Sequence, residues 1–160
     1  MIELVDAVRL SVESKNWFAA LFLAITLPDV CGKLESPQAE SRKRYEDWFN
    51  RYLSRKYAML IDGYPVVFMA AGDVYAIRCA LLHEGSDDVS EQRARETLEK
   101  FHFTSSAQKG MYRIGSERGF LGLNVAHFCK DICAGVEAWE RDVSTNPEVV
   151  ARIAAMVRIG

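Results

Sequence analysis

The stretch "YAIRCALLHEG", residues 75–85, has the apolar spacing of a helix with a defined end. Ile77 and Leu81 fall on one side of a helical wheel, as the residues of a core-facing stripe do. We expect the helix to begin near Asp73, as its N-cap, and to stop at Gly85, a residue type common at helix C-termini. A capped helix with one core-facing stripe is the building unit of a helical bundle.

The same helix carries a second, half-apolar face. Tyr75, Cys79 and Leu82 lie on it, and Arg78 and His83 flank them. Burying an unpaired charge is costly, so these two side chains must reach a surface or meet a partner. A second apolar face usually meets another helix or another chain, and we therefore expect Tyr75, Cys79 and Leu82 at a dimer interface. On one straight helix Arg78 and His83 lie about 7.5 Å apart along the axis, too far for an easy direct hydrogen bond.

The N-terminal third predicts three helices. The first thirty residues contain two, with Ser14 or Asn16 as the cap of the second and Pro28 as its break. A third is expected from about Glu40 to Tyr57. The apolar stretch inside the second helix is too short to span a bilayer, so we expect no membrane segment.

The remainder of the chain predicts more helix around a small β element. Residues 61–67, "IDGYPVV", are expected to form a loop, and short glycine-punctuated segments predict a small β-hairpin near residues 100–123. Asn124 is a candidate N-cap of a long helix, and Asn146 followed by Pro147 opens the last one. The expected fold is all-α, a bundle of five or six helices with this one β excursion.

Composition sets the broad class. The 160 residues are 49% hydrophobic and 26% charged, with a net charge of -2, which is ordinary for a single globular domain spanning residues 1–160. No global field attracts this chain to nucleic acid. The four cysteines form no CxxC pair and no secretory leader is evident, so we expect reduced thiols and a cytoplasmic protein.

The segment "RCALLH", residues 78–83, resembles the Arg-x(4–6)-His motif of HEPN domains (higher eukaryote and prokaryote nucleotide-binding domains). HEPN proteins are small α-helical bundles, commonly dimeric, and many are metal-independent endoribonucleases of toxin–antitoxin and antiviral systems. The resemblance implies that Arg78 and His83 are catalytic, that two motif helices form one cleft in a homodimer, and that RNA and an antitoxin protein are partners. No cofactor is implied. At the position after the arginine, where active relatives often have a polar residue, this chain has Cys79.

These residue types suit RNA cleavage. The 2′-OH of RNA can attack the adjacent phosphate, and histidine exchanges protons near neutral pH. Arg78 would hold the phosphate and stabilise the charge developing on it. Two alternatives stay open. In one, the domain is non-catalytic and Arg78 and His83 bind RNA, a nucleotide or a protein. In the other, Arg78 pairs with an acid at a helix interface and His83 interacts with the helix dipole.

A basic stripe on the third helix is a second candidate. Arg44, Trp48, Arg51 and Arg55 follow i, i+4, i+7, i+11 spacing, which suits a surface that follows a phosphate backbone and stacks a base. We expect nucleic-acid binding there, with a solvated basic face and Trp48 at the core edge as the alternative.

Two further patterns are weaker. Arg95 and His102 match the same loose motif on a charged segment, and a solvated surface explains them. His127, Cys129 and Cys133 lie close together in the sequence but do not share one helix face, so core cysteines are expected instead of a metal site.

Overall fold

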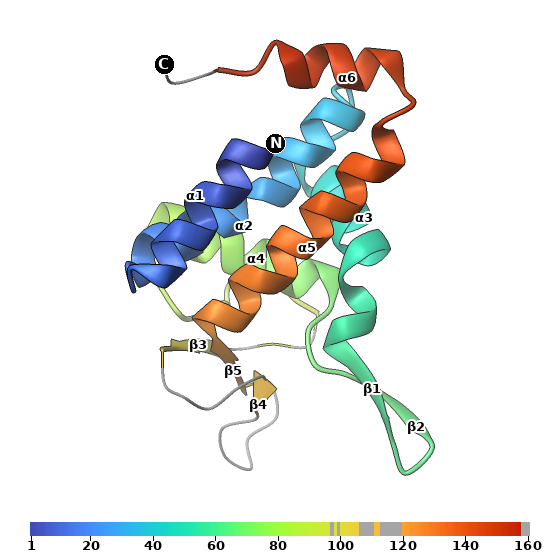
Figure 1. The fold of residues 1–160 in the computed structure, drawn as a ribbon. Coiled ribbons are helices and arrows are strands. Elements are labelled where there is room, and N and C mark those ends of the chain that lie inside the picture. The colour runs from blue at the N-terminus through green and yellow to red at the C-terminus, as the bar shows by residue number, and fades with distance from the viewer. Residues whose placement is uncertain (97, 99, 106–110, 113–119, 158–160) are drawn as a thin grey trace.

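The computed structural model describes residues 1–96, 98, 100–105, 111–112 and 120–157. Within these residues the chain is mostly helical, with two small sheets (Figure 1). The helices are α1 (Ile2–Glu13), α2 (Trp17–Glu35), α3 (Ser41–Tyr52), α4 (Ala71–Cys79), α5 (Val125–Val143) and α6 (Pro147–Ala154). A 3₁₀ turn, η1 (Ser54–Tyr57), follows α3, and a π-helical turn, η2 (Ala80–Glu84), continues α4.

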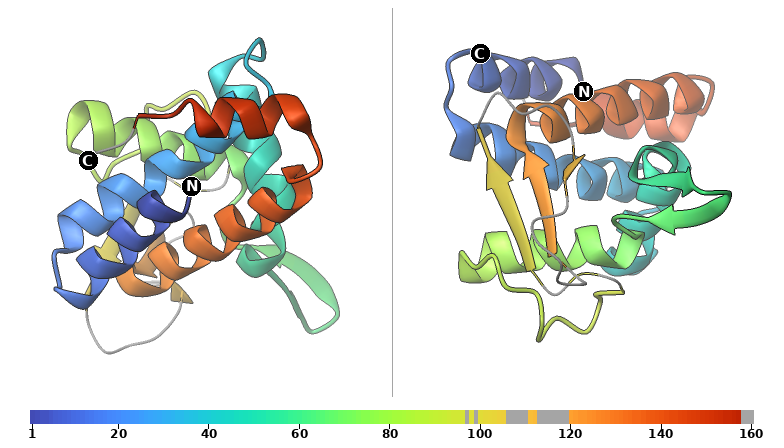
Figure 2. Two further views of the ribbon diagram at one scale, coloured as in Figure 1. Left: turned by 45° about the horizontal axis from the view of Figure 1, so that its top comes forward. Right: turned by 90° about the horizontal axis from the view of Figure 1, so that it is seen from below.

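Helix α2 is the centre of the bundle and contacts α1, α3, α5 and α6. Helix α4 packs on α3, and α6 lies across one end of the molecule (Figures 1 and 2). The largest fully buried side chains are aromatic and come from α3, η1, β3 and α5: Tyr45, Phe49, Tyr57, Phe101, Phe128 and Trp139.

The sequence predicted that helix α2 breaks at Pro28, but in the structure the helix continues through this residue. Asn16 caps its start, accepting from the backbone N–H of Ala19, and the helix runs through Pro28 to Glu35. Proline removes one backbone donor. The buried hydroxyl of Tyr45 donates to the nearby carbonyl of Ile25 at 3.0 Å, so this part of the helix gains a tertiary hydrogen bond. The continuation of α2 places Asp29 within the helix.

Helix α4 starts three residues earlier than predicted. Its N-cap is Ala70, and the carboxylate of Asp73 accepts from the backbone N–H of Ala70 at 2.9 Å. The fully buried Asp73 also accepts from the backbone N–H groups of Glu96 and Leu98. Asp73 is therefore the N3 residue of α4 and not its N-cap, and its carboxylate both closes the start of the helix and fixes the segment that follows η2.

The other end of α4 confirms the prediction. Gly85 adopts φ 63°, the left-handed conformation that favours glycine, and terminates the helix after its π turn. Two predicted N-caps are also confirmed. Asn124 accepts from the N–H of His127 at the start of α5, and Asn146 caps α6, with Pro147 in the first turn.

Two β elements differ from expectation. The segment predicted to be a loop contains an antiparallel hairpin, β1 (Ala58–Ile61) and β2 (Tyr64–Val67). Asp62 and Gly63 between them both have positive φ, 52° and 81°, which makes a type I′ turn.

The second sheet has the order β3 (Lys100–Thr104), β5 (Phe120–Asn124), β4 (Met111–Tyr112). Strands β4 and β5 pair antiparallel, which agrees with a small antiparallel element in the predicted region, whereas β3 pairs parallel with β5 and is not part of a hairpin. Residues 106–110 and 113–119 of that prediction lie outside the described residues.

By length and apolar composition, α2 is the one helix among the described residues that could cross a membrane. Core helices meet the same criteria, and the central position of α2 in the bundle agrees with that role.

Candidate functional site

Arg78 and His83 are in contact. The Nη1 atom of Arg78 lies 3.5 Å from Nε2 of His83, at the long limit of a hydrogen bond. The sequence had predicted that a straight helix keeps them apart. Residues 80–84 form a π-helical turn, which has more residues per turn than an α-helix. The imidazole of His83 therefore lies on the same side of the helix as Arg78, within contact distance.

The geometry of the contact assigns the hydrogen-bonding roles of its two partners. A guanidinium only donates hydrogen bonds, so Nε2 of His83 is the acceptor where the two groups bond. The imidazole is exposed to solvent, whereas the side chain of Arg78 is 18% exposed. The pair therefore joins a mostly buried cation to a solvent-accessible imidazole.

Asp29 holds the arginine in place. Its Oδ2 accepts from Nη2 of Arg78 at 3.1 Å, and its Oδ1 lies 3.1 Å from Nη2 of Arg44. Ser41 donates a further hydrogen bond to Oδ1 at 3.3 Å. Three helices, α2, α3 and α4, thus meet at one carboxylate.

Aromatic rings support the same arginine. The guanidinium carbon of Arg78 lies 5.8 Å from the ring centroid of Tyr75, a cation–π distance. Tyr75 in turn meets Tyr45 edge to face, with centroids 5.6 Å apart. Burial raises the pKa of Tyr45, so its hydroxyl remains a neutral donor to the α2 backbone.

The cluster has more positive than negative charge. Arg44 and Arg78 together contribute two positive charges, and Asp29 contributes one negative charge. The Nε atoms of both arginines are buried and have no hydrogen-bond partner among the described residues. An arrangement of this kind can attract a phosphate and orient it beside an exposed imidazole.

Tyr75, Cys79 and Leu82 are all half-buried. A second apolar strip lies on the neighbouring helix α2. Phe18 is 78% exposed and its ring lies 6.4 Å from that of Phe22. On a regular helix, positions 18, 22 and 29 fall within about 40° of one another, so this strip and the carboxylate at 29 share one side of α2.

The predicted basic stripe does not form one surface. Arg44 belongs to the Asp29 cluster, and Arg51 pairs with Glu35 at 2.8 Å. Trp48 is 2% exposed and packs against α5, where Gly135 leaves room for its ring. Arg55 is exposed, but α3 ends at Tyr52 and places it in the 3₁₀ turn. A buried indole offers no face on which a base could stack. Trp48 lies on the side of α3 that packs against α5.

The two weaker patterns lie apart from this cluster. Arg95 and His102 are exposed, and Arg95 donates to the carbonyl of Ser90. Cys129 and Cys133 are buried, and burial raises their pKa values to about 12 and about 11. The burial of both side chains confirms the prediction that they are core cysteines.

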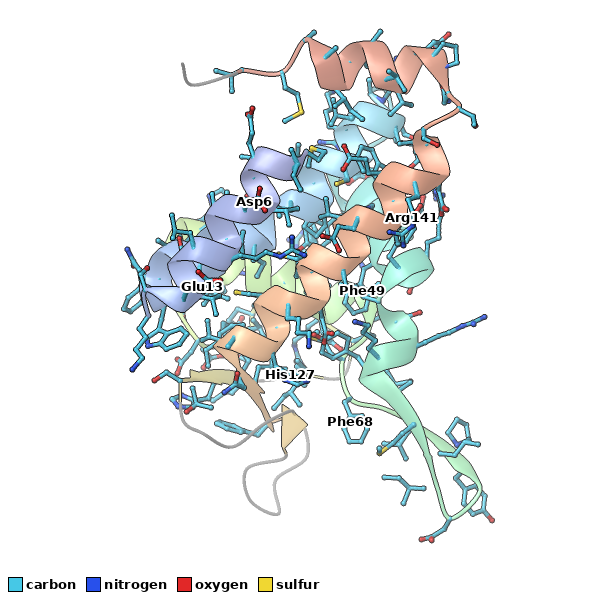
Figure 3. All side chains as sticks on the ribbon, in the orientation of Figure 1. Asp6, Glu13, Phe49, Phe68, His127 and Arg141 are labelled. Atoms are coloured by element: carbon cyan, nitrogen blue, oxygen red, sulfur yellow. The ribbon has the colours of Figure 1, made fainter. Side chains whose placement is uncertain are left out.

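Two hollows given by the described residues lie elsewhere. One of about 350 Å³ lies between the end of α3 and the root of the β1–β2 hairpin, and includes Arg55. Another of about 320 Å³ lies at the start of α5, beside His127, labelled in Figure 3. No group of three His, Cys, Asp or Glu side chains suited to a metal ion occurs among the described residues.

Asp29 is the residue that sequence analysis missed. It follows Pro28, and a helix predicted to break at the proline placed it in a turn. The helical spacing from Phe18 and Phe22 was a usable signal, because it continues through Pro28 to an acid on the same side. Its partners are 15 and 49 residues away, so the ion pairs themselves could not be predicted locally.

Comparison of this chain with family models, with curated proteins and with solved structures finds no match.

Proposed function

We propose that this protein is a HEPN-like, metal-independent endoribonuclease of the toxin–antitoxin or phage-defence type, working as a cytoplasmic homodimer. The observation that carries the proposal is the 3.5 Å contact between an exposed histidine and an arginine held by Asp29. The arginine and the histidine of the Arg-x(4–6)-His motif are therefore in contact, and the ion pair with Asp29 fixes the orientation of the arginine.

The proposed reaction needs a base, an acid and a charge clamp. Neutral His83 takes the proton of the 2′-OH, whose oxygen attacks the neighbouring phosphorus, and the bond to the 5′-oxygen breaks. The proton returned to that oxygen gives a 5′-OH end, and the other fragment ends in a 2′,3′-cyclic phosphate. Arg78 stabilises the negative charge on the phosphoryl oxygens as the bond forms.

The dimer part of the proposal rests on apolar surface next to the cluster. Tyr75, Cys79 and Leu82 are half-buried, and on α2 Phe18 is exposed and Phe22 half-buried. A second copy covering this area would exclude water from the cluster, which strengthens the interaction of Arg78 with a phosphate. An antitoxin protein that binds the same area would block it.

A specific observation favours a second candidate. Arg78 is paired with Asp29 and mostly buried, as a structural arginine at a helix interface would be. In that case the domain is a non-catalytic module that binds RNA, a nucleotide or a protein. Cys79, a weak hydrogen-bonding residue beside Arg78, also favours this alternative.

Cleavage assays with purified protein separate the two candidates. On the nuclease proposal, Arg78→Ala and His83→Ala each lower the cleavage rate by about two orders of magnitude or more, as loss of a charge clamp or an acid–base group does. Arg95→Ala and His102→Ala are matched controls on an exposed segment and leave the rate unchanged. Cleavage survives EDTA, and a 2′-deoxy nucleotide at the scissile position blocks it.

Cys79→Asn adds a test of the residue beside the arginine. It introduces the polar side chain often present in active relatives and should preserve or raise the rate. If this variant and the wild type are both inert on every RNA while Arg78→Ala still weakens RNA or nucleotide binding, the binding module replaces the nuclease. Loss of cleavage with EDTA and recovery with magnesium would contradict the metal-independent mechanism.

A further inference from the structure

The hairpin of β1 and β2 carries apolar side chains that the rest of the protein does not cover. Leu60 is 73% exposed and Tyr64 75%, and Met59, Ile61 and Val67 are 53%, 44% and 45% exposed. Figure 1 shows the hairpin projecting beyond the helices at the end of the molecule opposite α6, and Figure 3 shows its side chains standing clear of the helical body. A two-stranded hairpin alone is marginally stable in water, so exposed apolar residues on both faces indicate a missing partner.

The hydrogen-bond register shows which backbone groups are open. The N–H of Phe68 donates to the carbonyl of Tyr57 at 2.8 Å, which places that pair in the inward-facing positions of the ladder. Antiparallel ladders alternate. The backbone groups of Ala58 and Leu60 on β1, and of Pro65 and Val67 on β2, therefore point outward from the hairpin.

The two edges are not equivalent. The outward positions of β2 include Pro65, which has no N–H and interrupts that edge. The outward edge of β1 has a donor and an acceptor at both Ala58 and Leu60. Neither proline nor charge protects it, although natural edge strands usually carry such protection. An added strand would therefore pair with β1.

We propose that the β1 edge pairs antiparallel with the β1 edge of a second copy of this chain, which makes a four-stranded sheet across a two-fold axis. In the register that uses all four open groups, Ala58 lies opposite Leu60 of the second copy, and Met59 lies on the axis. This contact is separate from the face that bears Tyr75, Cys79 and Leu82, and it does not depend on the proposed nuclease activity.

Charge favours a second copy over an unrelated strand. Asp62 in the turn is the one charged residue of segment 58–67, and the basic pair Arg55 and Lys56 immediately precedes β1. In the proposed register Asp62 lies opposite Lys56 of the second copy and near its Arg55. The two-fold axis repeats this contact, so each copy supplies the acid for one end of the sheet and the bases for the other.

The size of the contact sets its strength. Four-residue strands bury less than the roughly 800 Å² per partner of a stable specific interface. We therefore expect association at micromolar concentration, detectable by sedimentation equilibrium of the full chain.

Proline substitution tests the edge directly. Leu60→Pro removes an outward N–H that the hairpin itself does not use, and Val67→Pro does the same on the opposite edge as a matched control. Both are measured in the wild type and in a Leu82→Glu background, which removes any association through the α4 face. Two symmetry-related hydrogen bonds are lost in Leu60→Pro, so we expect about tenfold to hundredfold weaker dimerisation, with Val67→Pro unchanged.

A charge variant checks the register without touching the backbone. Asp62→Lys should weaken association and should do so most at low salt, because it places like charges opposite each other. Circular dichroism and thermal melting establish that each variant is folded. A Leu82→Glu protein that is monomeric at 200 μM overturns the proposal, as does equal association of Leu60→Pro and Val67→Pro. An extended peptide or another protein would then be the partner of this edge.

Discussion

Asp29→Asn is the change that most directly tests how the cluster is held. Asp29 accepts from Arg78 and lies 3.1 Å from Arg44, and these two side chains are 18% and 13% exposed. The substitution keeps the shape and one acceptor, but it leaves two guanidinium groups facing each other without a counter-charge. Removal of one partner from a fully buried pair costs about 3–5 kcal/mol, and an exposed pair is worth about 0–1 kcal/mol.

Because the carboxylate is 21% exposed, we take a value between these limits. The free energy of unfolding should fall by about 2–3 kcal/mol, which for a chain of this length lowers Tm by roughly 4–12 °C. Chemical denaturation followed by circular dichroism measures the loss. Asp47→Asn is the control, because Asp47 pairs with Lys43 on the exposed side of α3 and should change stability by less than about 0.5 kcal/mol.

A double-mutant cycle then separates the ion pair from other effects. Arg78→Gln should cost less in the Asp29→Asn background than alone, by about 1 kcal/mol, since its partner has already been removed. If Asp29→Asn is no more destabilising than Asp47→Asn, or if the two changes at 29 and 78 are additive, the carboxylate does not hold the arginine.

The remaining predictions concern the core. Gly72→Ala would place its Cβ 2.2 Å from the carbonyl oxygen of Ala94, so we expect a loss of about 1–3 kcal/mol, larger than that of Gly32→Ala, whose Cβ meets the Cβ and the carbonyl oxygen of Arg44 only at 3.1 Å. Equal denaturation midpoints for these two variants would contradict the close packing. Burial raises the pKa values of Cys129 and Cys133 to about 12 and 11, above the roughly 8.5 of an unfolded thiol. The folded state then holds more protons, so the free energy of unfolding should decline as pH rises above about 9. Cys129→Ala/Cys133→Ala should flatten that decline, and an unchanged slope would refute the assignment.

Local chemistry predicted three of the helix ends. Gly85, Asn124 and Asn146 act where the sequence placed them, because a cap depends on a few neighbouring backbone groups. The β1–β2 hairpin was also predictable from Asp62 and Gly63, a favoured type I′ pair between apolar segments, and treating the segment as a loop overlooked that signal.

Long-range effects account for the other differences. The buried side chains around Pro28 keep α2 helical where local preference alone predicted a break. The parallel pairing of β3 and β5 joins segments twenty residues apart, so neither strand contains the information by itself. The contact of Arg78 with His83 depends on a π turn, and helical spacing assumed for a regular helix cannot reproduce it.

The π turn also divides the cluster into parts of different rigidity. Arg78 lies in the regular part of α4 and is tied to two other helices through one carboxylate, whereas His83 follows in the widened last turn and is exposed. A solvent-exposed last turn opens at lower free energy than the packed helix before it. Amide hydrogens of residues 83–86 should therefore exchange faster than those of residues 75–79. The cation therefore keeps one position, whereas the exposed imidazole beside it can change its orientation without moving the three helices that meet at Asp29.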